Sequence, residues 1–192
     1  SRPKLMIDKL TTEDKALKIN LTKDIYGCFA EIGAGQEVAA NFFTAGGSSG
    51  TIAFTHSAYD MKVSDAMYGV AKRYVCEERL LTMLGAECDQ LMKILPQKNK
   101  ESRFFAFCNT VESLNYHKTN QGQGWVGIRF QKSIGGPFNE IILHVKMHDI
   151  SNKAQQEALG ILGVNLIYGA FFQTQDQEEF VSSLVSRLPR ER

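Results

Sequence analysis

The sequence contains no long uninterrupted hydrophobic segment. Nowhere do apolar residues continue for the roughly 18 positions that a membrane-spanning helix requires. Residues 1–25 also lack the continuous apolar core of a secretory signal peptide. We therefore expect a soluble protein with no membrane span, located in the cytoplasm.

An excess of charge of either sign is also missing. The 22 Lys and Arg residues oppose 21 Asp and Glu residues, which leaves a formal net charge of +1. A chain with this balance has no global field that would gather nucleic acid or anionic membrane, so no nucleic-acid partner is indicated. Its 192 residues, of which 43% are hydrophobic, are enough for one globular domain with a substantial core.

Paired cysteine motifs are absent as well. The four cysteines, Cys28, Cys76, Cys88 and Cys108, are widely separated, form no CxxC pair and lie among apolar neighbours. Free cysteine is among the most frequently buried residue types, so we expect reduced thiols and neither a disulfide framework nor a zinc site. The sequence indicates no metal and identifies no cofactor.

Charged residues dominate the start of the chain, where hydrophobic periodicity is weak. We expect residues 1–24 to form a loosely ordered arm with at most a short helix around residues 12–18. A single globular α/β domain should then span residues 25–192. Its first elements are a buried strand in "YGCFAEIGAG", a short helix in "QEVAANFF" and a second strand in "TIAFTHSAY".

Three helices and three further strands complete the expected fold, and the last helix is the amphipathic segment "DQEEFVSSLVSRL". The first helix follows Ser64 and Asp65 and ends at Pro96, with charged residues such as Glu87 opposite its apolar face. That apolar face comprises Leu80, Leu81, Leu84, Cys88, Leu91, Met92 and Leu95. The strands "RFFAFCNTV", "GWVGIRFQK" and "EIILHVKMHD" have short connections, which favour antiparallel pairing. "SNKAQQEALGILGVNLIYGAFF" is apolar nearly all round and predicts a buried helix.

These elements predict an α/β or α+β fold. Its sheet should be mixed, with a C-terminal antiparallel three-stranded portion, packed by the long amphipathic helix and the buried apolar helix. Gly160, Gly163 and Gly169 weaken the apolar helix unless another segment packs closely against them.

A glycine turn between the first strand and the first helix is the main candidate for a site. Gly33-Ala34-Gly35 would let backbone amides approach an anion, but the pattern also suits a simple tight turn. The third glycine of a dinucleotide fingerprint is replaced by Val38, and no Walker-type G-K-[ST] follows.

Several polar residues follow the second strand, where ligands of open α/β sheets often bind. If the first two strands are parallel, the glycine turn lies at the same edge as these residues, whereas an antiparallel pair would separate them. The expected ligand-binding residues are Gly33, Gly35, Gln36, His56, Tyr59, Asp60 and Lys62. The residues Gly46, Gly47, Ser48, Ser49 and Gly50 should form a mobile loop at the opposite edge. No catalytic residue is assigned.

"GGSSGTIAFTH" is similar to the start of nucleotidyltransferases, which carry an H-x-G-H signature after a glycine-rich segment. In this chain the corresponding residues are His56-Ser57-Ala58-Tyr59, so the glycine and the second histidine are absent. "SSLVSR" near the end is distantly similar to the second phosphate-binding motif of that superfamily. The resemblance implies a degenerate nucleotidyltransferase, which we keep as a minor alternative.

A wider resemblance covers residues 26–172. "FAEIGAGQEVAANFF", "GTIAFTHSAYDMKVSDAMYG", "GWVGIRFQ" and "QQEALGILGVNLIYGAFF" resemble a little-characterised, mostly bacterial protein family. Its members often carry the labels TonB-dependent receptor or nicotinate-nucleotide adenylyltransferase, and neither label is supported by motifs here. Because the members are longer, the resemblance implies one domain or a shortened relative.

Two functions from different classes follow. The first is binding of a phosphorylated small molecule or nucleotide at the glycine turn, with the chemistry unknown. The second is a non-catalytic interaction or assembly module that docks through the apolar helix on another copy or a larger assembly. Whether the protein is an enzyme is left open.

Overall fold

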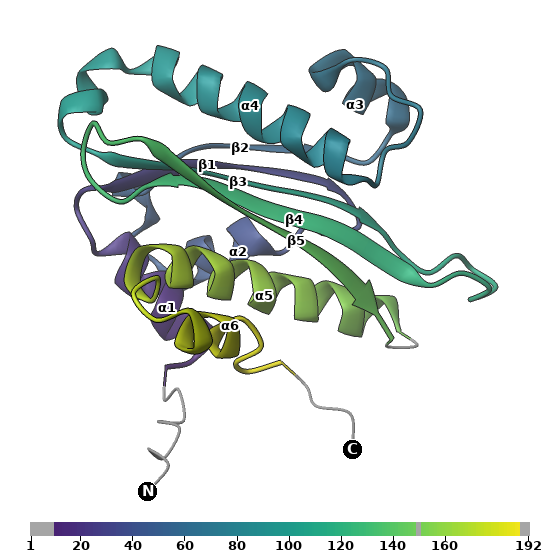
Figure 1. Ribbon diagram of the computed structural model, residues 1–192. Coiled ribbons are helices and arrows are strands. Elements are labelled where there is room, and N and C mark those ends of the chain that lie inside the picture. The colour runs from purple at the N-terminus through teal and green to yellow at the C-terminus, as the bar shows by residue number, and fades with distance from the viewer. Residues whose placement is uncertain (1–9, 149–150, 189–192) are drawn as a thin grey trace, which may run out of the picture.

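The computed structural model describes residues 10–148 and 151–188, which fold into a sheet between two helical layers (Figure 1). The strands are β1 (Ile25–Gly33), β2 (Ile52–Ala58), β3 (Arg103–Glu112), β4 (Gly122–Gln131) and β5 (Phe138–Met147). The helices are α1 (Thr12–Asn20), α2 (Val38–Ala45), α3 (Met61–Tyr68), α4 (Glu77–Ile94), α5 (Asn152–Phe172) and α6 (Gln177–Leu184). Short 3-10 turns occupy Ser48–Gly50 and Pro96–Lys100.

The strand order is β2-β1-β3-β4-β5. Strand β1 is parallel to both β2 and β3, whereas β3, β4 and β5 are antiparallel to their neighbours. The expected mixed sheet with a C-terminal antiparallel three-stranded portion is therefore confirmed. The short links between the last three strands permit only antiparallel neighbours, while the helical crossovers permit the parallel pairs.

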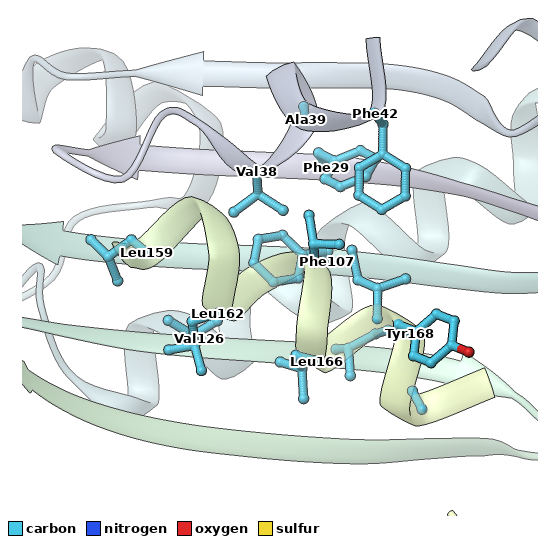
Figure 2. Close-up of a cluster of buried hydrophobic side chains, with 14 of the residues drawn as sticks. Phe29, Val38, Ala39, Phe42, Phe107, Val126, Leu159, Leu162, Leu166 and Tyr168 are labelled. Carbon is cyan, nitrogen blue, oxygen red and sulfur yellow. The ribbon is translucent and has the colours of Figure 1, made fainter. Parts of the chain in front are cut away.

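Helices α3 and α4 cover one face of the sheet, and α1, α2, α5 and α6 cover the other (Figure 1). The larger core lies on the second face, where α5 packs against the sheet and α2 packs beside it. Figure 2 shows Leu159, Leu162 and Leu166 of α5 facing Phe107 and Val126 of the sheet. Four phenylalanines at the sheet centre, Phe29, Phe104, Phe105 and Phe107, are at most 1% exposed.

The glycines of α5 lie where other segments approach closely. A Cβ atom on Gly163 would come within 2.3 Å of Val38 Cγ2, and one on Gly169 within 2.7 Å of Phe180 Cε2. One on Gly160 would come within 3.1 Å of Glu37 Cβ. The expectation that these glycines allow close packing is confirmed, because α2 and α6 press against α5 at these points.

The structure differs from expectation at the start of the chain. We expected a loose arm up to residue 24, but α1 packs into the core, where Ala16 and Ile19 are fully buried. Lys15 is also buried and donates to Asn165 Oδ1 at 2.9 Å, so a charged residue occupies an inward position of this helix. Because this inward position holds a lysine, the sequence of α1 does not show an amphipathic pattern. Residues 1–9 of the expected arm lie outside the described residues.

The expected helix after Ser64 and Asp65 is in fact two helices. Both residues lie inside α3, and α4 begins only at Glu77, after a Cys76 cap. Gly69, at φ +86°, ends α3 in a conformation that glycine favours. The helix end before Pro96 is as expected.

All four cysteines are free thiols, and burial raises the pKa of Cys88 to about 12.

We predict opposite effects of the same substitution in two helices. Gly163→Ala should lower the free energy of unfolding by about 1–3 kcal/mol, because the new methyl group overlaps Val38 and overpacks the core. Gly85→Ala in α4 should raise it by up to about 1 kcal/mol, because a Cβ there meets only Arg129 Nη1, at 3.7 Å. Denaturant unfolding measures both, and changes of equal sign would contradict the close packing of α2 on α5.

Candidate functional site

Parallel pairing of β1 and β2 brings the glycine turn and the "SAYD" segment to one edge of the sheet. Ile32 is opposite Ala58, so both strands end side by side. Near these ends, the hydroxyl of Ser57 in β2 donates a hydrogen bond to Gln36 Oε1. The expected parallel arrangement is confirmed and the antiparallel alternative is wrong. Residues 46–50 precede β2 and therefore lie at the opposite edge, as expected, while their mobility stays a prediction.

The two glycines of the turn allow it to pack directly on β3. Gly33 has φ +78°, and a Cβ there would lie 2.3 Å from the carbonyl oxygen of Val111. A Cβ on Gly35 would lie 2.7 Å from Val111 Cγ2. The amide of Ala34 donates to the Val111 carbonyl at 3.1 Å. Close approach to a neighbouring strand thus explains both glycines without a ligand.

Gln36 closes the turn with its own side chain. Its Nε2 donates to the carbonyl oxygens of Glu31, at 2.7 Å, and Gly33, at 2.8 Å. Its Oε1 accepts the Ser57 hydroxyl, so both ends of the amide are engaged. Gln36 therefore couples the turn to β2.

A buried carboxylate lies at the N-terminus of α2. Glu31 is 4% exposed, and its two oxygens accept from the amides of Val38, at 2.8 Å, and Ala39, at 3.2 Å. Asn109 Nδ2 on β3 lies 3.4 Å from the same carboxylate and donates to the Gly35 carbonyl at 2.9 Å. A helix N-terminus favours an anion, and here the protein supplies one. Burial raises the pKa of Glu31 to about 7.

His56 lies on the opposite face of the sheet from Gln36. Successive side chains of a strand alternate between faces, so His56 points toward α4 while Ser57 points toward the turn. His56 Nδ1 lies 2.9 Å from Glu87 Oε2, and Tyr68 donates to Glu87 Oε1 at 2.7 Å. Burial raises the pKa of Tyr68, and the neighbouring Glu87 adds to the shift. The structure therefore does not bring His56 together with Gly33, Gly35 and Gln36.

The remaining expected residues begin α3. Asp60 caps this helix by accepting from the amides of Lys62, at 2.8 Å, and Val63, at 3.3 Å. Tyr59 is 75% exposed, and Lys62 is exposed too. Within the described residues Lys62 belongs to no ion pair. The rim of the site therefore consists of Gln36, Ser57, Tyr59, Asp60 and Lys62.

Sequence reasoning missed four polar residues. Glu31, Ser57 and Asn109 lie around the glycine turn, and Tyr68 lies beside Glu87. Glu31 had a detectable signal, since a lone carboxylate in an otherwise apolar strand must find internal donors. Glu87 was assigned to the charged face of its helix, but it is 2% exposed and bound by His56 and Tyr68. Its burial depends on α3 folding over α4, which periodicity does not reveal.

Two surface hollows lie away from this rim. One, of about 420 Å³, is lined by Cys88, Asp89, Met92, Arg129, Phe138, Asn139 and Glu140. The other lies along α1, between Asp14 and Thr22. Across residues 10–148 and 151–188, no three His, Cys, Asp or Glu side chains are grouped so as to hold a metal ion. In the same residues no helix has the length and hydrophobicity to cross a membrane.

Comparison with known proteins gives structural likeness only, since neither a protein-family model nor a curated protein matches the chain. The fold resembles a competence-damaged protein (CinA) superfamily protein from Enterobacter cloacae, at TM-score 0.60 and 11% identity. That match covers 85% of this chain and 94% of the other. The competence/damage inducible protein CihA from Agrobacterium tumefaciens matches at TM-score 0.54 and 18% identity, over 81% of this chain and 93% of that one. These identities establish a shared fold alone.

We predict that Glu31 makes stability depend on pH. Its pKa of about 7 in the folded protein exceeds the unfolded value of 4.5, so its stabilising contribution is complete below pH 4.5 and is lost as pH rises to about 7. The loss should be roughly 3 kcal/mol across that window. Glu31→Gln should flatten this part of the profile.

Denaturant unfolding at a series of pH values measures this difference. Glu157→Gln, which removes an exposed carboxylate on α5, is the matched control and should follow the unmodified protein. A Glu31→Gln profile parallel to that of the unmodified protein would show that Glu31 is not the titrating group.

Proposed function

We propose that the protein binds a phosphorylated small molecule, such as a nucleotide, at the carboxyl edge of β1 and β2. The observation that carries the proposal is the hydrogen bond between Ser57 and Gln36, which joins the glycine turn to the segment that leads into α3. A hydroxyl group, an exposed aromatic ring and the exposed Lys62 ammonium follow one another within residues 57–62 of this segment, which supports the location.

The chain topology supports this location. The connection after β1 passes through α2 on one face of the sheet, and the connection after β2 passes through α3 and α4 on the other (Figure 1). In open α/β sheets, ligands bind outside the carboxyl ends of strands where consecutive connections leave toward opposite faces. The end of β1 between β2 and β3 is such a point.

Glu31 limits how an anion would be held. Its carboxylate already accepts from the first amides of α2, so a phosphate does not replace it there. The Ser57 hydroxyl already donates to Gln36 Oε1, so the ligand would instead bind on the outer side of the turn through Lys62, which supplies the positive charge. Protonation of Glu31 removes a nearby negative charge, so binding should strengthen as pH falls below about 7.

The alternatives fit the geometry less well. A nucleotidyltransferase would need His56 beside the glycine turn, but this ring is bound to Glu87 on the other face. Docking through the apolar helix would need a free apolar surface on α5. Most of residues 159–170 are instead buried by the sheet and by α1, α2 and α6. An assembly function would require another surface.

A thermal-shift screen against nucleotides, sugar phosphates and inorganic phosphate tests the proposal. A ligand at 100 times its dissociation constant should stabilise the protein by about 2.7 kcal/mol. Lys62→Ala should weaken the response about tenfold in ligand concentration, because one charged contact to phosphate is lost.

Lys93→Ala is the matched control, since Lys93 is exposed at the far end of α4, which runs away from the carboxyl edge. It should leave the response unchanged. The absence of a shift with every phosphate compound, or an equal loss in both lysine variants, would refute the proposed site.

A further inference from the structure

Strand β5 forms one edge of the sheet. Among residues 10–148 and 151–188 it pairs only with β4, so one side of its ten-residue backbone has no strand partner (Figure 1). It contains neither proline nor glycine and shows no bulge in its pairing with β4. Natural edge strands are normally protected by shortness, bulges, proline or charged side chains, since a regular edge recruits another strand. Of these, β5 has charged side chains, Glu140 and Lys146.

Both faces of β5 carry side chains that a strand paired at this edge would contact. Ile141, Leu143 and Val145 are half-buried against the α5 side of the core. On the opposite face Glu140 and Lys146 are both exposed, and Glu140 also accepts a hydrogen bond from Arg129 of β4. Their charges are opposite, and each lies three residues from Leu143.

We propose that a second copy of this chain pairs antiparallel with β5, in a register centred on Leu143, to form one continuous sheet. A two-fold axis perpendicular to the sheet keeps equivalent faces together, so Leu143 lies opposite Leu143 of the partner subunit. Glu140 then lies opposite Lys146 of the partner subunit, and symmetry forms this pair twice. The interface is self-complementary, as a two-fold dimer requires.

Charge selects this register over its neighbours. Moving the centre to Ile142 places Glu140 opposite His144 of the partner subunit and Lys146 opposite Phe138 of the partner subunit. Moving it to His144 places Lys146 opposite Ile142 of the partner subunit. Only the centre at Leu143 pairs Glu140 with Lys146, and opposite charges directly across strands stabilise a sheet.

The other edge strand lacks this property. Strand β2 has seven residues, Ile52–Ala58, and none of them is Asp, Glu, Lys or Arg. It therefore offers no charge pair to fix a register with its own copy. The proposal accordingly concerns β5 alone and does not depend on ligand binding at the β1–β2 edge.

Charge reversal tests the pairing through the molar mass measured by light scattering after size exclusion. The unmodified chain should be a dimer. Lys146→Glu alone sets Glu140 against a glutamate, and Glu140→Lys alone sets a lysine against Lys146, so each variant should shift to monomer. An equimolar mixture of the two should recover the dimer, because both charge pairs then re-form between unlike copies.

Lys132→Glu is the matched control, because it makes the same charge change in the exposed β4–β5 turn and should leave the dimer intact. Circular dichroism of each variant separates loss of pairing from loss of folding. A monomeric unmodified chain, single variants that remain dimeric, or a mixture that remains monomeric would each overturn the proposal.

Disulfide cross-linking tests the register independently. In a Cys76→Ser background, Leu143→Cys should form a disulfide-linked dimer under mild oxidation, because directly opposed Cα atoms lie about 4.5–5.5 Å apart. Lys146→Cys should not form this disulfide. In this register the two substituted positions are six residues apart along the strands, which is roughly 20 Å. Equal cross-linking of both variants, or of neither, would exclude this register.

Discussion

The arrangement of the sheet around the site depends on the bonds of one buried carboxylate. Glu31 on β1 accepts from the first turn of α2, and Asn109 on β3 contacts both Glu31 and the turn between them. A buried carboxylate without such donors would be strongly unfavourable. The strand, the helix and the turn therefore have to adopt their relative positions together, and this fixes where Gln36 meets Ser57.

Both faces of the sheet bury apolar clusters. On the face covered by α3 and α4, polar groups of α4 add further contacts to α3 and to the segment after it. Arg79 donates to the Gly69 carbonyl and to Ser64, and its guanidinium lies against the rings of Tyr68 and Tyr74. Because α3 carries Lys62, the position of the proposed ligand contact depends on this arginine and on Glu87.

Elements that are buried through apolar contacts could be predicted from the sequence, whereas features that depend on buried polar contacts could not. The strands and α5 were recognisable because their apolar runs match the period and length of buried elements. A short helix was also expected where α1 lies, but its burial was not, because Lys15 occupies a buried position by bonding Asn165, 150 residues away. The glycine turn and the parallel pairing were predicted correctly. That Glu31 would fill the α2 N-terminus and that His56 would turn to Glu87 depended on tertiary contacts with no local pattern.

A single row across the sheet relates the two proposed surfaces. Ser57, Glu31, Asn109, Val126 and Leu143 are successive cross-strand neighbours from β2 to β5. The first three are polar and hold the turn, and the last two are apolar and contact the α5 core. Polar groups at a strand end favour binding of a charged molecule, whereas an apolar residue on an edge strand favours burial against another strand. The change from polar to apolar along this row therefore separates the proposed ligand-binding edge from the proposed dimer edge.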